Sequence, residues 1–385
     1  MDFQLTDEQR LVQATAREFA TKEILPRAAE LDRTAAYPAD IVAAAAGLGL
    51  MGMTVPEEYG GAGMDLVAYV VAQEELARAS AGVQAIVTVN NSLVCDPIVR
   101  FGSEDQKRRY LPRLCSGESL GCYCLTEPAA GSDAMSLQTS ARADGDEWVL
   151  RGTKLFVTNG AEADVCIVYA RTGTAPGARG LSAFIVEKSM PGIAVGKIEK
   201  KLGIKCSSTT EIVLEDCRVP AENLLGEPGM GGRIALGTLD VGRIGIAAQA
   251  IGIARAALEE SLAYALSRTQ FGRRIGTFQA IQWMLSDMAT RIDAARLLAY
   301  RAAHLRQGGA RCTKEASMAK LFASETAMWA AHKAVQIHGG YGFISDYPVE
   351  RYFRDAKITE IYEGTSEIQR LVIARNVLEV RGANH

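Results

Sequence analysis

The sequence predicts an α+β protein that is mostly helical, with an N-terminal helical domain, a middle antiparallel β-barrel-like domain and a C-terminal four-helix bundle. Three observations predict this order. The chain opens with helical periodicity, changes in its middle to short β-branched and aromatic runs, and ends in long helical segments. A chain of 385 residues is long enough for two or three domains. We therefore predict domains at residues 1–120, 121–229 and 230–385.

The N-terminal domain is predicted from a helix start followed by a repeating apolar face. Thr6 and Gln9 have the spacing of a capping box, in which side chain and backbone bond reciprocally. Apolar residues then recur at helical spacing as far as Pro26. Alanine-rich segments at residues 40–50 and 68–80 continue the helical pattern.

The middle domain is predicted from four short runs rich in β-branched and aromatic residues. They lie at residues 147–150, 155–158, 166–169 and 211–214, and turn-forming residues separate them. Short strands of this kind are typical of an antiparallel sheet or a small barrel.

The C-terminal domain is predicted from the strongest helical signal in the chain. Helical patterns run through residues 232–267, 278–305, 313–337 and 366–378. Four long helices in one region favour a bundle.

The composition indicates an ordinary globular protein. The chain is 48% hydrophobic, which supports a large core, and its net charge of −3 provides no basic field for nucleic acid or an anionic membrane. The longest charge-free apolar stretch near the N-terminus, residues 41–55, is shorter than the roughly 20 residues that a membrane-spanning helix needs. Residues 1–4 lack the basic start of a signal peptide. We therefore expect a cytoplasmic protein.

Cysteine and histidine spacing predicts no metal site. The eight cysteines stand at residues 95, 115, 122, 124, 166, 206, 217 and 312. The closest pair, Cys122 and Cys124, is too tightly spaced for the usual Cys-x-x-Cys site, and none of the four histidines pairs with another at helical spacing. An even number of cysteines is compatible with disulfides, but a large chain without a secretory signal argues against them.

Several motifs allow two interpretations when each is taken alone. Residues 125–133 combine small residues, hydroxyls and free N–H groups that suit a flavin edge or a phosphate, and an ordinary interdomain turn explains them equally well. Residues 229–232 contain two glycines of a dinucleotide fingerprint but lack the third, so a loop before a helix is favoured. Asp240 and Arg243 have the spacing of an intrahelical ion pair.

Two further residues carry the same ambiguity. Glu363 precedes Gly364, whose backbone can approach a ligand closely, but a solvated glutamate before an N-cap at Thr365 is the simpler account. Arg268 can grip a pyrophosphate, or it can complement the end of a helix that Gly272 terminates.

Taken together, these motifs resemble the acyl-CoA dehydrogenases over nearly the whole chain. The resemblance rests on LTEPAAGSD at 125–133, GTKLFVTN at 152–159, RTQFG at 268–272, QIHGGYG at 336–342 and YEGTSEIQR at 362–370. Residues 89–93 and 239–247 resemble the short-chain, butyryl-CoA-type members. The family fold of helical domain, β domain and four-helix bundle agrees with the order predicted above.

The resemblance implies FAD, bound between the β domain and the C-terminal bundle. The implied cofactor-binding residues are Tyr123, Leu125, Thr126, Gly131, Ser132, Phe156, Thr158, Arg268, Gln270, Phe271, Gln279, Gln336, Gly339, Gly340, Thr365 and Glu367. Phe156 stands where many relatives have Trp. By the same resemblance, a neighbouring subunit lends Arg268, Phe271 and residues 336–340, so that the monomer is inactive and the protein is a homo-oligomer, as in the family's homotetramers.

The resemblance also implies a reaction. Glu363 removes the α proton of an acyl-CoA thioester, the β carbon passes a hydride to the flavin, and an electron-transfer flavoprotein accepts the electrons. The backbone N–H of Glu363 and a flavin ribityl hydroxyl stabilise the thioester oxygen. Burial should raise the pKa of Glu363. The implied substrate-binding residues are Ser132, Asp240, Arg243, Tyr362 and Gly364.

Substrate choice follows from three positions. Gly242 stands where isovaleryl- and long-chain relatives carry their base, which leaves Glu363 as the matching base. Gln84 falls where glutaryl-CoA relatives carry an Arg, so a dicarboxylyl thioester is disfavoured. The match at residues 89–93 favours a straight short chain, with butyryl-CoA central. An acyl-CoA oxidase that uses oxygen and a non-catalytic acyl-CoA-binding protein are the alternatives.

Overall fold

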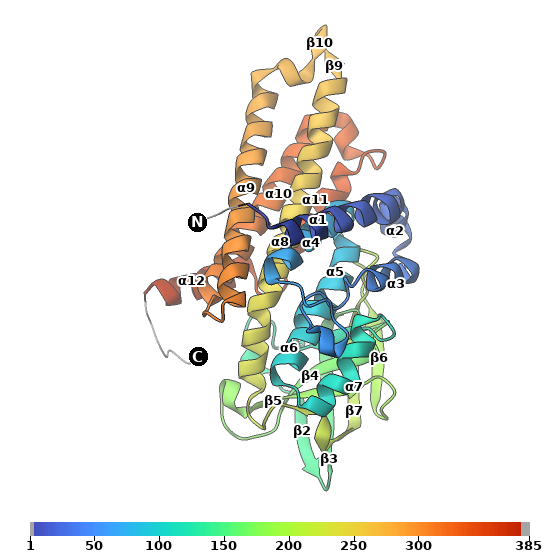
Figure 1. Cartoon of the computed structure of the whole chain (residues 1–385), viewed down its shortest axis with the longest axis vertical. Coiled ribbons are helices and arrows are strands. Elements are labelled where there is room, and N and C mark those ends of the chain that lie inside the picture. The colour runs from blue at the N-terminus through green and yellow to red at the C-terminus, as the bar shows by residue number, and fades with distance from the viewer. Residues whose placement is uncertain (1–3, 379–385) are drawn as a thin grey trace.

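The computed structural model describes residues 4–378, in which helices, a sheet and further helices follow one another along an elongated molecule (Figure 1). The outer ends of the predicted first and third domains, residues 1–3 and 379–385, lie outside the described residues. A mostly helical protein with a sheet domain between two helical regions is therefore confirmed.

The N-terminal region consists of helices joined by turns. Its α-helices are α1 (Asp7–Phe19), α2 (Ala28–Thr34), α3 (Ala39–Gly47), α4 (Leu66–Ala79), α5 (Ala81–Thr88), α6 (Asp96–Phe101) and α7 (Glu104–Cys115). The predicted capping box is present, because Thr6 accepts from the Gln9 backbone and Gln9 accepts from the Thr6 backbone. After α1 the chain continues through a π turn and a 3₁₀ turn, so Pro26 redirects the helical path without ending it.

The middle region is one eight-stranded sheet. Its strands are β1 (Gly121–Cys124), β2 (Ser140–Asp144), β3 (Glu147–Thr158), β4 (Val165–Arg171), β5 (Leu181–Glu187), β6 (Ile193–Ile198), β7 (Thr209–Pro220) and β8 (Leu224–Leu225). The order is β6-β7-β3-β2-β4-β5-β8, and β1 pairs with β4 off this path. The β1–β4 pair and the single β2–β4 bridge are parallel, so the sheet is mixed and the prediction of a purely antiparallel sheet is wrong.

One long strand replaces two predicted ones. The runs at residues 147–150 and 155–158 both belong to β3, which pairs with β7 over its length. The register shifts twice, between Leu150 and Gly152 and between Lys154 and Val157. These bulges interrupt the alternation that identifies a strand in a sequence, and bulges of this kind bend a strand locally.

The C-terminal region contains α8 (Gly231–Ser267), α9 (Gln279–Gln307), α10 (Thr313–His338), α11 (Val349–Thr359) and α12 (Ser366–Val377). The four predicted helices are present as α8, α9, α10 and α12, whereas α11 was missed. Helices α8, α9 and α10 pack against one another, α11 packs on α8 and α10, and α12 packs on α10. A short hairpin of β9 (Thr269–Gln270) and β10 (Arg273–Arg274) forms the tip after α8.

Helix α8 connects the parts of the molecule. It is long and apolar enough to cross a membrane, yet 78% of its most apolar window is buried inside the protein, as in a core helix. Its first half contacts β4 and β5 of the sheet, its middle packs on α4, and its end carries the hairpin tip (Figure 1).

Candidate active site

Glu363 lies in a tight turn between α11 and α12. Its φ is 53° and that of Gly364 is 95°, so two successive residues adopt left-handed backbone. A glutamate is uncommon in this region, and strain of this kind persists only where the surroundings impose it.

Two buried side chains impose the turn. Lys320 on α10 donates to the Gly364 carbonyl at 2.7 Å. Gln369 on α12 donates to the carbonyls of Glu363 and Gly364, at 3.2 and 2.9 Å. Thr365 is the N-cap of α12 and accepts from the Ile368 backbone, as expected for a helix start. The turn therefore has little freedom to relax.

The Glu363 carboxyl points at α8. A Cβ at Gly242 would collide with Glu363 Oε2, so glycine is required there for the carboxyl to occupy its position. Burial raises the pKa of Glu363 to about 7, although the charges of Lys320 and Arg243 act in the opposite direction. The prediction that burial raises this pKa is confirmed. A carboxyl of this kind exchanges a proton near neutral pH.

Polar atoms around Glu363 are unsatisfied. Within residues 4–378, the buried atoms Glu363 Oε2, Arg243 Nε, Tyr123 Oη and Gln369 Oε1 have no hydrogen-bond partner. Such atoms are costly in a folded protein unless a ligand or water completes them. Their presence together marks this place as a binding site.

Asp240 and Arg243 form the predicted ion pair, at 3.0 Å. Asp240 also accepts from Thr313 at 2.8 Å, so its carboxylate is fixed between two helices. The Tyr362 hydroxyl donates to Gln249 on α8, which directs this ring away from the tip of the turn.

The interior beyond Glu363 is closely filled. A Cβ at Gly245, three residues after Gly242, would meet Thr88 Oγ1 at 2.5 Å and Tyr69 Oη at 2.7 Å. These two hydroxyls hydrogen-bond each other at 2.6 Å. Gln84 is fully buried and donates to Gln73 at 2.8 Å.

On the sheet side, β1 leads into the loop of residues 125–133. The Tyr123 ring packs against Tyr169 with centroids 5.1 Å apart. Glu127 shapes the loop, because its carboxylate accepts from the Gln138 and Thr139 backbones at 2.6 and 2.9 Å.

Two further facts describe this loop. A buried ion pair of Glu127 with Lys154, at 2.7 Å, fixes it to β3. Leu125 is buried, Thr126 is half-buried, and Gly131 and Ser132 are exposed to solvent. The loop thus has a fixed base and an open outer edge.

The kink in β3 exposes an aromatic ring. Phe156 has φ 56° and a side chain that is 63% exposed, whereas Thr158 is half-buried. Asn159 then ties the end of β3 to its neighbours by donating to the carbonyls of Ile86 and Gly121, both at 3.2 Å. A strained, exposed aromatic on a rigid strand is a surface prepared for a flat ligand.

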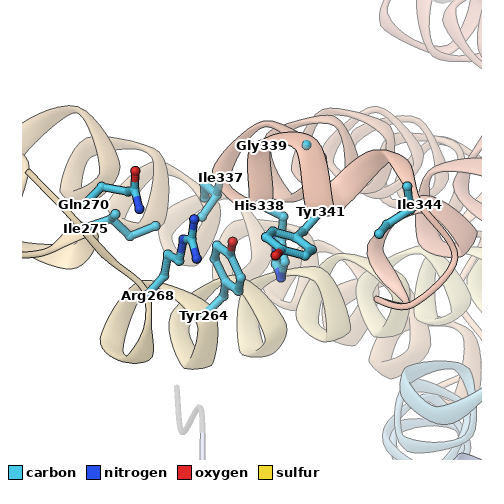
Figure 2. Close-up of a pocket in the computed structure, with 10 residues that line it drawn as sticks. Tyr264, Arg268, Gln270, Ile275, Ile337, His338, Gly339, Tyr341 and Ile344 are labelled. Carbon is cyan, nitrogen blue, oxygen red and sulfur yellow. The ribbon is translucent and has the colours of Figure 1, made fainter.

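A second site lies at the far end of α8. A cavity of about 500 Å³ is lined by Tyr264, Arg268, Gln270, Ile275, Ile337, His338, Gly339, Gly340, Tyr341 and Ile344 (Figure 2). His338 stacks on Tyr264 with centroids 4.3 Å apart, and the Arg268 guanidinium lies 5.5 Å from the Tyr341 centroid. The remaining predicted residues at this end, Phe271, Gln279 and Gln336, are exposed, as is Glu367 on α12.

The predicted residues therefore form two groups. From Arg243 to Tyr264, α8 rises roughly 32 Å. Arg243 and Tyr123 lie close to Glu363, whereas Arg268 lines the cavity at the other end of α8. Figure 1 shows one end of α8 at the sheet and the other at the hairpin tip. Within a single chain the two groups do not surround one ligand.

Family models account for the whole arrangement. The model of the acyl-CoA dehydrogenase N-terminal domain matches residues 6–118, that of the middle domain matches 122–217, and that of the C-terminal domain matches 229–378. The chain belongs to the acyl-CoA dehydrogenase family. The family is one of flavin-dependent oxidoreductases, and the predicted resemblance is confirmed.

Known family members resemble this one over their full length. The short-chain specific acyl-CoA dehydrogenase of Clostridium acetobutylicum is 50% identical over 377 residues, which are 98% of this chain and 100% of that protein. The butyryl-CoA dehydrogenase structure from Megasphaera elsdenii has a TM-score of 0.96 and 46% identity, and covers 98% of this chain and 100% of its own. A chain in a structure described as the electron transferring flavoprotein of Acidaminococcus fermentans has a TM-score of 0.97 and 48% identity, with coverage of 98% and 100%.

Sequence reasoning missed the residues that hold the site in place. Lys320 and Gln369 fix the Glu363 turn, and Glu127 and Lys154 fix the loop. Lys320 is 44 residues away from its partner Gly364. A lysine in the apolar face of a predicted helix was the one available signal, since lysine is rarely buried without a partner.

Proposed function

We propose that this chain catalyses the FAD-dependent α,β-dehydrogenation of a short-chain acyl-CoA thioester to the trans-2-enoyl-CoA, with Glu363 as the catalytic base. The observation that carries the proposal is the Glu363 carboxyl itself, which is buried beside Gly242 with a pKa raised to about 7. A base with such a pKa is deprotonated in part at neutral pH and still takes a proton readily.

The turn of residues 362–365 orients the base. Because Lys320 and Gln369 hold its carbonyls, Glu363 presents Oε2 toward α8 and receives the α proton there. In this proposal the backbone N–H of Glu363 donates to the thioester oxygen, as the family resemblance implies, and so stabilises charge that develops during proton removal. The turn then supplies both the base and a donor from one rigid segment.

The residues at the sheet end fit a flavin. Phe156 offers an exposed ring, Thr158 and Thr126 offer hydroxyls, and the Tyr123 hydroxyl lies unpartnered among the described residues. We propose that these residues, with Leu125, Gly131, Ser132, Thr365 and Glu367, hold the ring and its ribityl chain. When bound, FAD supplies the acceptor for the hydride that leaves the β carbon.

The tip completes the cofactor site of a neighbouring subunit. Arg268, Gln270, Phe271, Gln279, Gln336, Gly339 and Gly340 would hold the adenine and pyrophosphate of its FAD. The rise of roughly 32 Å along α8 from Arg243 to Tyr264 supports this, because it separates the tip from the residues around Glu363 in the same chain. We propose a homotetramer, as is usual in the family, in which each site takes residues from two chains.

The substrate is held between α8 and the Glu363 turn. We propose that Arg243 and Asp240, with Ser132, Tyr362 and Gly364, contact the acyl-CoA, since the Arg243 Nε is buried without a partner in the described part of the chain. About one helical turn beyond Gly242, the hydroxyls of Thr88 and Tyr69 hydrogen-bond each other and pack closely against α8 at Gly245. These contacts limit the length of the acyl chain, which favours a short chain, with butyryl-CoA as the central candidate.

Further features of the proposal concern the protein as a whole. An electron-transfer flavoprotein would accept the electrons. All eight cysteines are free, which fits an enzyme of the cytosol, where thiols are kept reduced. We also propose that α8, α9 and α10 belong to a four-helix bundle and that the sheet closes in a barrel-like manner. The domain limits at residues 120 and 229 stay predictions.

The test is kcat/KM with an electron-transfer flavoprotein or an artificial acceptor, measured from propionyl- to dodecanoyl-CoA and with isobutyryl-, isovaleryl- and glutaryl-CoA. A misfit of one methylene costs about 1–3 kcal/mol, so a short pocket gives a sharp maximum near four carbons. A maximum at eight carbons or with glutaryl-CoA contradicts the short-chain assignment. Turnover that consumes oxygen stoichiometrically identifies an oxidase, and binding without turnover identifies a binding protein.

A further inference from the structure

Three thiols converge on the face of the sheet opposite to the Tyr123 ring. Cys122 and Cys124 lie on β1, and Cys166 lies opposite Cys122 on the parallel neighbour β4. The three sulfurs lie within 4.8 Å of one another, and those of Cys122 and Cys124 are 3.7 Å apart. We call these three residues the thiol triad. Spacing along the chain concealed it, because Cys166 is 42 residues beyond Cys124 and joins it only through strand pairing.

The triad has the dimensions of a coordination site. Three thiolates around one ion, each at about 2.3 Å, would place the sulfurs roughly 4 Å apart. The observed separations already approach this triangle, and the paired backbones of β1 and β4 hold the three Cβ atoms on one side of the sheet. Among the described residues, no histidine or carboxylate joins the three sulfurs at that distance. The site therefore offers three sulfur ligands and lacks the fourth that structural zinc requires.

The surroundings select the charge of the occupant. The triad is fully buried in an apolar cluster with Leu150, Val168, Phe184 and Val186. Lys154, whose charge acts on Cys124, is already paired with Glu127 at 2.7 Å. Three thiolates carry a charge of −3. The net charge of the occupied site is therefore −2 with a monovalent ion, −1 with a divalent ion and zero with a trivalent ion. A net charge is costly in such an interior, which favours a trivalent centre.

We propose that Cys122, Cys124 and Cys166 form a binding site for a trivalent thiophilic centre, with arsenic(III) as the ligand of matching softness, coordination number and charge. Arsenous acid, As(OH)₃, reacts with the three thiols by exchange. Three As–O and three S–H bonds break, three As–S bonds form, and three water molecules leave. No atom changes oxidation state, so the step requires no oxidant or reductant.

The triad is closed to solvent, so capture proceeds through local opening of the sheet. Tyr123, between the two β1 cysteines, points to the opposite face, where it contacts Tyr169. Binding is therefore measured directly, without reference to turnover, and the result does not depend on the proposed function.

The experiment incubates the purified full-length protein with sodium arsenite, removes the excess and measures arsenic per chain. One arsenic per chain is expected, with X-ray absorption showing three As–S neighbours. Three of the eight thiols should also become unreactive in denaturant. Each of the variants Cys122→Ala, Cys124→Ala and Cys166→Ala removes one of the three sulfur ligands and should weaken the retention of arsenic by roughly 100-fold.

The matched control is Cys95→Ala. Cys95 lies beside Cys115, so this variant breaks up the one other close thiol pair that we consider, and the retention of arsenic should be unchanged. A coordination number of two, or retention lost in Cys95→Ala and kept in Cys124→Ala, would overturn the proposal. Cadmium(II) serves as the divalent comparison, and tighter binding of cadmium than of arsenic would overturn the charge argument. The X-ray absorption result stands on the unaltered protein, so a variant that fails to fold does not leave the question open.

Discussion

The two ends of α8 are built differently. The sheet end gathers Glu363, Arg243 and Tyr123, whereas the tip carries the residues that the family resemblance assigns to the cofactor of a neighbouring subunit. Around Glu363, side chains from three helices meet, the carboxyl is buried, and the turn is held by Lys320 and Gln369. At the tip, Phe271 is 93% exposed and the cavity beside Arg268 opens on the surface. One chain thus encloses the Glu363 carboxyl by itself, whereas the tip is open to solvent.

The difference in burial between the two ends of α8 indicates which end a second chain would contact. A group that packs against its own chain performs its task alone, whereas exposed aromatic and cationic residues on a rigid tip indicate a contact that another chain provides. The predictions below separate the two ends by altering one at a time.

The largest effect is expected at the base. Glu363→Gln preserves the size and hydrogen bonding of the side chain but removes the proton acceptor, so kcat should fall roughly 10²–10⁴-fold while flavin content stays unchanged. Steady-state kinetics and the flavin absorbance measure both. Glu360→Gln, three residues away and paired with Lys357 at 2.7 Å, is the matched control and should retain activity. Near-normal turnover in Glu363→Gln would mean that another residue is the base.

At the tip, Arg268→Ala should weaken FAD binding roughly 10- to 100-fold, because a charged hydrogen bond of about 1.5–3 kcal/mol is lost. Equilibrium dialysis of the flavin measures this. If the contact is made to a neighbouring subunit, Arg268→Ala and Glu363→Gln subunits complement each other. Random pairing of an equal mixture would place an intact base and an intact arginine together in about a quarter of the sites. Full flavin affinity and activity in a monomeric form would contradict the shared site.

A smaller effect is expected from the charge beside the base. Lys320 lowers the pKa of Glu363, so Lys320→Met should raise it, and the base would then ionise only at higher pH. Each unit of upward shift reduces the ionised fraction at neutral pH by up to about tenfold. The pH profile of kcat/KM should move to higher pH, with activity recovered there. Lys320→Arg keeps the charge and should keep the profile, and a uniform loss at every pH would indicate a purely structural role.

The smallest effect concerns the cap of α12. Thr365→Ala removes the acceptor for the Ile368 N–H and should cost about 1 kcal/mol in the free energy of unfolding. Denaturant unfolding measures it, and Thr365→Ser should restore the stability. Because Thr365 is also proposed to hold the flavin, flavin content should fall in Thr365→Ala and return in Thr365→Ser, which keeps the hydroxyl, and unchanged flavin content in Thr365→Ala would contradict that role.

The fold was predictable where local patterns are long and uninterrupted. Helices α8, α9 and α10 exceed 25 residues, and their periodicity identified them. By contrast, β1 has four residues, two of them cysteines, and it pairs with β4 in parallel. Neither its length nor its composition marks it as a strand, and its partner depends on contacts far along the chain. The two bulges of β3 similarly made one strand resemble two.

The candidate site was predictable in its reactive group and not in its supports. The motif around Glu363 pointed to this carboxyl as the candidate base, and burial raises its pKa as expected. That Lys320 and Gln369 would meet the turn depends on how α10 and α12 pack, and no local pattern encodes that packing. The resemblance implied that Arg268 serves a neighbouring subunit, and the path of α8 gives the physical reason, because the helix carries Arg268 far from Glu363.

The length of α8 has a consequence for how this molecule can change. Each residue of a helix adds about 1.5 Å and turns the chain by about 100°, so deleting one residue between Arg243 and Tyr264 would swing the whole tip to another side. Seven residues make nearly two full turns, and only a change of about that size would keep the phase while moving the tip by roughly 10 Å. A single insertion or deletion in α8 would therefore change the direction of the tip as well as its distance from the sheet, which a substitution on the exposed face of the helix would not do.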